Sequence, residues 1–123
     1  MNWDKEVDIL VVGSGAGGLL SALVAADNHA DVLIIEKEKL WGGTSATSGA
    51  GIWIPDSDNA KAEGFEDDTE DAFKYVRALS ADNVPDDNIR AYVENASDML
   101  RWMQEKAPVG YIAYPYPDYH AEN

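Results

Sequence analysis

The sequence contains no cysteine and few basic residues, and both shortages exclude classes of protein. Without cysteine there can be no disulfide, no thiolate metal site and no cysteine nucleophile. Redox chemistry would therefore need a bound cofactor. Nine basic residues against 23 acidic ones give a formal net charge of -14, which repels nucleic-acid phosphates and anionic membrane surfaces. We expect neither a nucleic-acid partner nor a metal site.

Long hydrophobic runs are also missing. No apolar stretch approaches the ~18 to 20 residues of a membrane helix, and residues 1–6 lack the basic and then apolar order of a secretory signal. The chain has 123 residues, of which 46% are hydrophobic. It is about one domain long and too apolar for a disordered protein. We expect a folded, cytoplasmic protein without a membrane span.

The first 36 residues have the pattern of a βαβ unit. Residues 7–12 and 31–36 are short apolar runs rich in valine and isoleucine, as buried parallel strands are. Between them, residues 19–26 form a nearly all-apolar segment typical of a buried helix. The predicted fold class is α/β, a Rossmann-like βαβ unit with two parallel strands.

A glycine motif lies between the first strand and the helix. Gly13 permits a tight turn, Gly15 lets the backbone approach a pyrophosphate, and Gly18 allows the helix to pack close to the strand. The helix N-terminus supplies free N–H groups to the anion. The residues predicted to hold a dinucleotide here are Gly13, Ser14, Gly15, Ala16, Gly17 and Gly18. The alternative is a glycine-rich turn that serves packing alone.

Glu36 closes the unit, 18 residues after Gly18. At this spacing an acidic side chain accepts hydrogen bonds from the adenosine ribose hydroxyls. Its charge would repel a 2′-phosphate, which disfavours NADP. The competing interpretation is a solvated glutamate at the end of a strand.

A second glycine cluster favours FAD over NAD. Gly42 and Gly43 precede Thr44, Ser45 and Ser48, which offer N–H groups and hydroxyls at a predicted helix start. Two such sites suit a long ligand with a diphosphate and a ribityl chain. The alternative is that Thr44 and Ser45 only cap a short helix. In that case the protein could be an ordinary NAD-dependent dehydrogenase.

The rest of the chain is predicted to be helical and then extended. We divide the whole chain, as the N-terminal part of one domain, into three segments. Residues 1–54 contain the βαβ unit and the second glycine-rich loop, residues 55–107 form a helical segment, and residues 108–123 form an extended Tyr/Pro-rich segment. Asp67 and Glu70 predict a capping box for one helix, and a second helix should begin after Pro85. Its predicted inward stripe consists of Ile89, Val93, Ala96, Leu100 and Met103. The tail tyrosines Tyr111, Tyr114 and Tyr116 are predicted to pack.

Several motifs together resemble a known family. Residues 41–55 read Trp-Gly-Gly-Thr-Ser-Ala-Thr-Ser-Gly-Ala-Gly-Ile-Trp-Ile-Pro, and residues 116–122 read Tyr-Pro-Asp-Tyr-His-Ala-Glu. With the βαβ unit, they are similar to FAD-dependent 3-ketosteroid Δ1-dehydrogenases and fumarate-reductase-like flavoproteins. The first run matches the Ser-Gly-Gly-Gly-Ile-Trp-x-Pro of the steroid branch, with Ala50 where many relatives have glycine.

The resemblance implies roles for residues. It places Glu36 on the adenosine ribose of FAD and adds Lys37 and Gly42 as cofactor contacts. It places the following residues on the ribityl and flavin side: Gly43, Thr44, Ser45, Ser48, Gly49, Ala50 and Gly51. It makes Tyr119 and His120 candidates for catalysis, His120 standing where many steroid relatives have tyrosine. Histidine titrates near neutrality and can act as a general acid or base. The alternative is that both rings pack a turn.

The resemblance also implies an activity. It predicts the FAD-binding portion of an oxidoreductase acting on carbon–carbon bonds next to a carbonyl, with a small, steroid-like substrate. Relatives are several times longer, so the chain should need the remainder of the polypeptide or a second chain. The alternatives are a fumarate-reductase-like flavoprotein and a non-catalytic dinucleotide-binding module.

Overall fold

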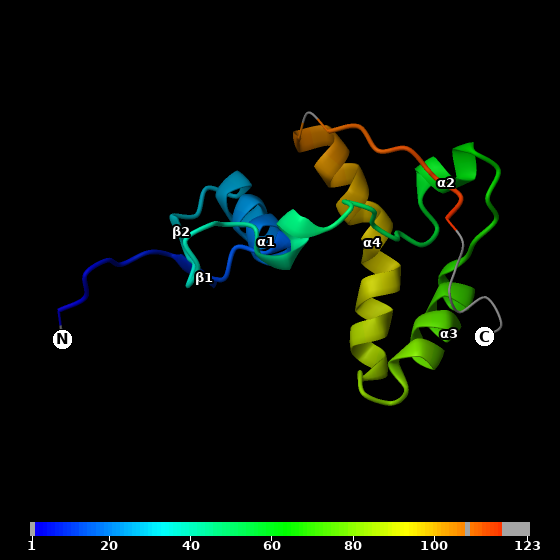
Figure 1. Ribbon diagram of the computed structural model, residues 1–123, viewed down its shortest axis with the longest axis horizontal. Coiled ribbons are helices and arrows are strands. Elements are labelled where there is room, and N and C mark those ends of the chain that lie inside the picture. Colours follow the sequence, from blue (N-terminus) through cyan, green and yellow to red (C-terminus); the bar gives the residue numbers. More distant parts are fainter. Residues whose placement is uncertain (1, 108, 117–123) are drawn as a thin grey trace. The chain divides into compact units, whose positions relative to one another are not determined.

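The computed structural model describes residues 2–107 and 109–116 (Figure 1). Tyr119 and His120 lie outside these residues. Contacts divide the chain into two compact units, Met1–Ile52 and Trp53–Asn123. Within the described ranges no helix is both long enough and apolar enough to cross a membrane.

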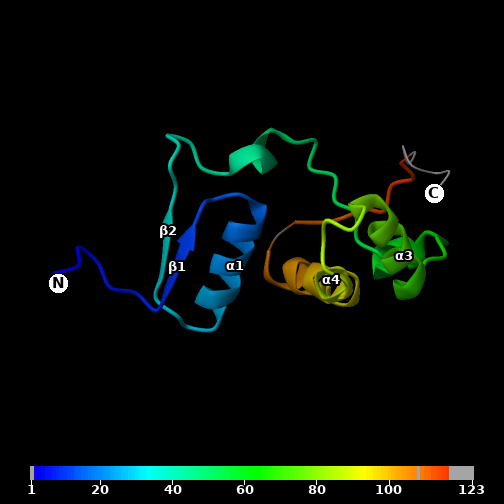
Figure 2. The same ribbon diagram turned by 90° about the horizontal axis from the view of Figure 1, so that it is seen from below.

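The first unit is a parallel βαβ arrangement. Strand β1 (Ile9–Val12) is followed by helix α1 (Ala16–Asp27) and strand β2 (Val32–Ile35). The strands pair in parallel, with Ile9 opposite Val32, and α1 packs along both of them (Figure 2). The predicted element order and parallel pairing are confirmed, although each strand is shorter than its apolar run.

The predicted burial of these strands and of α1 is wrong for the described residues. Leu10 and Val12 of β1 are 53% and 76% exposed, and Leu23 of α1 is 59% exposed. The sheet has two strands, and α1 packs on the face where Val11 points toward Gly18. Strands of parallel sheets are buried when layers cover both faces. Helix α1 packs against this sheet, but it leaves Leu10 and Val12 exposed.

The second unit is helical. It contains α2 (Asp58–Ala62), α3 (Thr69–Ser80) and α4 (Asp86–Lys106), with α3 lying beside α4 (Figure 1). Its core joins Ala72 of α3 to Ile89 and Val93 of α4. The predicted inward stripe is confirmed for Ile89, Val93, Ala96 and Leu100, all of which are buried, while Met103 is half-buried.

Helix α2 is short and was not predicted, because residues 55–64 lack an apolar period. Local polar bonds define it instead: Ser57 caps it by accepting a hydrogen bond from the Ala60 N–H at 3.3 Å. Arg101 of α4 donates to both carboxylate oxygens of Asp58, at 2.6 and 2.8 Å. This bidentate interaction connects α2 to α4 and lowers the pKa of Asp58.

Two further predictions need correction. The cap of α3 is Asp68, which accepts from the Asp71 N–H at 2.8 Å, whereas Asp67 accepts from the Asp56 N–H at 3.0 Å. Adjacent aspartates give the same sequence signal, and the loop geometry selects between them. Tyr114 and Tyr116 contact each other, with ring centroids 6.2 Å apart, but they are 71% and 69% exposed and are not buried in a core.

Candidate nucleotide-binding site

The turn after β1 depends on glycine. Gly13 has φ +95°, which disfavours any side chain, and its N–H donates to the Ile35 carbonyl at 2.8 Å. A Cβ at Gly18 would collide with the Gly13 carbonyl oxygen and lie 3.3 Å from Val11 Cγ1. The tight turn and the close approach of α1 to β1 are thus as predicted from these two glycines.

The N-terminus of α1 can accept an anion. Its N-cap residue is Gly15, which provides no side-chain cap, and the first turn of the helix carries no acidic residue. A Cβ at Gly15 or Gly17 would meet no atom within 4 Å. The first N–H groups and the positive end of the helix dipole are therefore not neutralised by a local carboxylate.

Glu36 lies at the carboxyl end of β2 and bonds back to the glycine loop. Its Oε2 accepts from the Ser14 N–H at 2.9 Å and from the Ser14 hydroxyl at 2.5 Å, and its Oε1 accepts from the Glu38 N–H at 3.0 Å. A carboxylate oxygen can accept two hydrogen bonds, so Oε1 keeps capacity for a ribose hydroxyl. The geometry fits the predicted role of Glu36.

These bonds lower the pKa of Glu36 from 4.5 to about 2, chiefly through the Ser14 hydroxyl and then through the backbone N–H groups of Glu38 and Ser14. A lowered folded-state pKa stabilises the fold above the unfolded value, and this stability is lost as the pH falls through the folded value.

We therefore expect wild type to unfold at a higher temperature than Glu36→Gln at pH 6, with the gap closing between pH 4.5 and about 2. Thermal unfolding followed by circular dichroism across this range checks the prediction. A gap that stays constant down to pH 2 would mean that Glu36 does not gain its bonds in the folded chain.

The second glycine cluster meets the first. The Gly42 N–H donates to Ser14 Oγ at 2.9 Å, and the Ala16 N–H donates to Ser45 Oγ at 3.2 Å. A Cβ on Gly43 would lie 3.4 Å from the Gly15 Cα. Two glycine-rich stretches that are about 28 residues apart in sequence thus form one cradle.

Gly42 has φ +105° and leads into a short 3₁₀ helix, η1 (Gly43–Thr47). The predicted helix start is therefore present, and the Ser48 hydroxyl closes η1 by donating to the Ser45 carbonyl at 2.8 Å. Other predicted site residues are exposed and lie along or beyond this segment or after β2: Lys37, Thr44, Gly49, Ala50 and Gly51.

Ala50 has the left-handed φ of +60°. This conformation costs an alanine ~1 to 2 kcal/mol, which a glycine at this position would not lose. Part of that gain is cancelled because glycine loses more conformational entropy on folding than alanine does. We expect Ala50→Gly to stabilise the chain by about 0.5 to 1 kcal/mol. Chemical denaturation of wild type and variant checks this.

The matched control is Ala91→Gly, an exposed position inside α4, which should destabilise by about 1 kcal/mol. Destabilisation by both variants would contradict the left-handed conformation of Ala50.

Sequence reasoning missed the bonds that hold this cradle together. Nothing in the Gly-x-Gly-x-x-Gly pattern marks Ser14, whose position accepts any residue, as the partner of both Glu36 and Gly42. The one available signal was its small hydroxyl side chain between two glycines.

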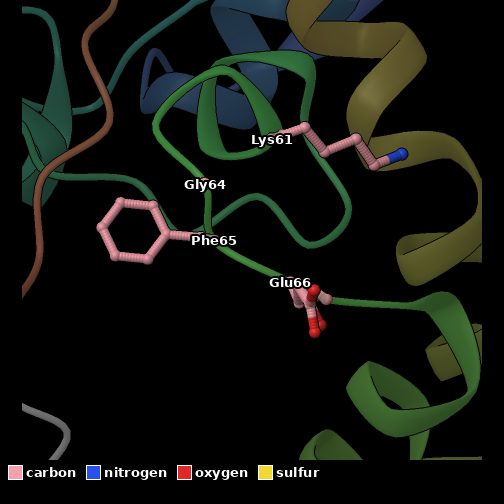
Figure 3. A pocket seen from close by; sticks show the side chains of 5 residues that line it. Lys61, Gly64, Phe65 and Glu66 are labelled. Carbon is pink, nitrogen blue, oxygen red and sulfur yellow. The ribbon is translucent and has the colours of Figure 1, made fainter.

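A hollow of about 380 Å³ in the second unit is separate from this cradle in sequence. It is lined by Lys61, Gly64, Phe65, Glu66 and Asp67. Figure 3 shows the Phe65 ring and the Lys61 side chain pointing apart, without converging polar groups. Among the described residues no group of three or more histidines and acids could hold a metal ion.

A glycine turn after a parallel strand, a helix whose N-cap residue has no side chain and an acid at the end of the next strand define a dinucleotide-binding fold. The chain belongs to the FAD-binding domain family: the family model described as "FAD binding domain" matches residues 8–120. FAD is thus the cofactor, and the cradle of the first unit, with room at Gly15 and an acceptor at Glu36, fits it.

The chain is also similar in sequence to known dehydrogenases. The chain is 37% identical over 119 residues to a 3-oxosteroid 1-dehydrogenase of Mycolicibacterium smegmatis. This match covers 96% of the chain and 21% of the relative. It is 39% identical over 116 residues to a 4-oxocyclohexanecarboxylate 2-dehydrogenase of Sinomonas cyclohexanicum, covering 94% and 20%.

Among solved structures, the 3-ketosteroid Δ1-dehydrogenase of Sterolibacterium denitrificans in complex with 1,4-androstadiene-3,17-dione matches with a TM-score of 0.74 and 36% identity. This match covers 83% of the chain and 18% of that structure. The chain spans about a fifth of the length of the curated relatives that it matches.

Proposed function

We propose that this chain forms the adenosine, pyrophosphate and first flavin-side contacts of the FAD site in a dehydrogenase that acts next to a ring ketone. The observation that carries the proposal is the junction of three segments at Ser14. Its backbone and side chain bond Glu36, and its hydroxyl accepts from Gly42. The junction places a ribose acceptor, the N-terminus of α1 and a second glycine cluster in one unit.

The pyrophosphate would lie against the N-terminus of α1, on the side of Gly15 where a Cβ would meet no atom within 4 Å. Glu36 would accept from the adenosine ribose, Ser45 would donate toward the ribityl chain, and Ser48 would accept from it. The remaining contacts assigned to FAD are Gly13, Ala16, Gly17, Gly18, Lys37, Thr44, Gly49, Ala50 and Gly51. Each is an interaction to be tested by substitution.

The substrate class is a cyclic ketone, with steroids as the first candidates. The names of the matched relatives describe dehydrogenation of rings that carry an oxo group, one a steroid and one a cyclohexane. The reaction removes hydrogen from two adjacent carbons, one as a hydride and one as a proton, and leaves a carbon–carbon double bond. FAD, when bound, supplies the two-electron acceptor for the hydride.

Tyr119 and His120 are the proposed groups for proton removal, within an extended Tyr/Pro-rich segment over residues 108–123. Burial and hydrogen bonding can tune a histidine or a phenol toward this task. We further propose that residues 1–123 are the N-terminal part of one cytoplasmic FAD-binding domain. The remainder of the polypeptide, or a second chain, would complete the substrate site.

The experiment is to incubate the purified chain with FAD, remove free FAD by desalting and record the visible spectrum. A retained flavin band supports the proposed site. A folded but colourless protein overturns the proposal that these residues hold FAD unaided.

Adding the remaining polypeptide and a 3-ketosteroid tests the activity separately. Reduction of an electron-accepting dye supports the dehydrogenase, and its absence with bound flavin favours a non-catalytic dinucleotide-binding module.

A further inference from the structure

Ser14 is a buried polar residue at the centre of the cradle. It is 2% exposed, and a buried hydroxyl is costly unless it is hydrogen-bonded. Here the hydroxyl donates to Glu36 Oε2 and accepts from the Gly42 N–H at 2.9 Å. Both kinds of bond that a hydroxyl can make are therefore used.

The two partners belong to opposite sides of the proposed FAD site. Glu36 ends β2 on the adenosine side, 22 residues from Ser14 in sequence, and Gly42 begins the flavin-side cluster, 28 residues away. We propose that Ser14 is a positioning residue that couples the two sides, so that one hydroxyl aligns both the ribose acceptor and the second glycine cluster. This inference rests on the proposed function.

Removing the Ser14 hydroxyl would have one effect at Glu36 and a second effect at Gly42. Glu36 would keep its bonds to the Ser14 and Glu38 N–H groups but lose the shortest one, which loosens the ribose acceptor. The buried Gly42 N–H would lose its acceptor, and Gly43 would no longer be held near Gly15. The first effect acts on any adenosine nucleotide, and the second acts on the flavin-side part of FAD.

The test is to measure the dissociation constants of ADP and FAD for wild type and Ser14→Ala by titration calorimetry. Lost neutral and charge-assisted hydrogen bonds lead us to expect an increase of about threefold for ADP and about tenfold or more for FAD. The matched control is Ser21→Ala on α1, where an exposed hydroxyl donates to the Gly17 carbonyl at 2.8 Å. Both constants of this control should stay within about twofold of wild type.

Equal increases for ADP and FAD, or no increase, would overturn the coupling role. A wild-type chain that binds neither ligand would overturn the proposed function itself, so the two failures are distinguishable.

A second measurement does not depend on the folding of a variant. In the wild type, hydrogen exchange at the Gly42 N–H should be slow, and ADP, which has no flavin-side group, should slow it further. Exchange at the rate of an unstructured amide, or no response to ADP, would also overturn the proposal.

Discussion

Gly15→Val should abolish FAD retention while leaving the fold intact. The Gly15 backbone has φ −65° and ψ 172°, an extended conformation that any residue adopts, and a Cβ there would meet no atom within 4 Å. The added methyl groups would occupy the space in front of the first N–H groups of α1, where a pyrophosphate would be held. Two lost charge-assisted hydrogen bonds, at about 1.5 to 3 kcal/mol each, correspond to an affinity loss of about 100-fold or more.

The measurement pairs a titration of the chain with FAD, followed by flavin fluorescence, with a thermal unfolding curve of the apo-protein. Gly18→Ala is the matched comparison, because its Cβ would collide with the Gly13 carbonyl oxygen. We expect Gly18→Ala to destabilise the chain by about 1 to 3 kcal/mol through overpacking. Gly15→Val should leave the unfolding temperature near that of wild type.

A Gly15→Val protein that keeps wild-type affinity for FAD would remove the pyrophosphate from the N-terminus of α1. A Gly15→Val protein that unfolds would show that this glycine serves packing, the alternative left open by the sequence pattern.

The sequence predicted the parts of the site that follow from backbone geometry. The glycine spacing implies the turn at Gly13 and the close approach at Gly18, because only glycine fits either place. The position of Glu36 follows from the length of a βαβ unit. These features depend on local conformation and on the rise per residue of strands and helices, and both can be read from spacing.

The sequence could not predict which side chains bond across segments. Ser14 joins Glu36 and Gly42 because the two loops meet in space, and no residue pattern records that meeting. The exposure of Leu10 and Val12 was missed for a different reason. An apolar run shows that a strand is suited to burial on both faces, but α1 leaves the Leu10 and Val12 side chains exposed.

Ile89→Ala should be among the most destabilising single changes in the second unit. Ile89 is 2% exposed and packs in one cluster with Ala72 of α3 and Val93 of α4. Removing its outer methyl groups loses burial and leaves a cavity between two helices that meet over few buried side chains. Changes of this kind cost about 2 to 5 kcal/mol, a large share of the ~5 to 15 kcal/mol that stabilises a typical domain.

The control is Ile112→Ala, the same chemical change at a side chain that is 87% exposed, which should alter the stability by no more than about 0.5 kcal/mol. Urea unfolding followed by the helical circular dichroism signal compares the two variants. Equal midpoints would show that α3 and α4 do not pack through Ile89. A large loss for Ile89→Ala alone would locate the stability of this unit at the contact between α3 and α4, because the two variants remove the same atoms and differ in burial.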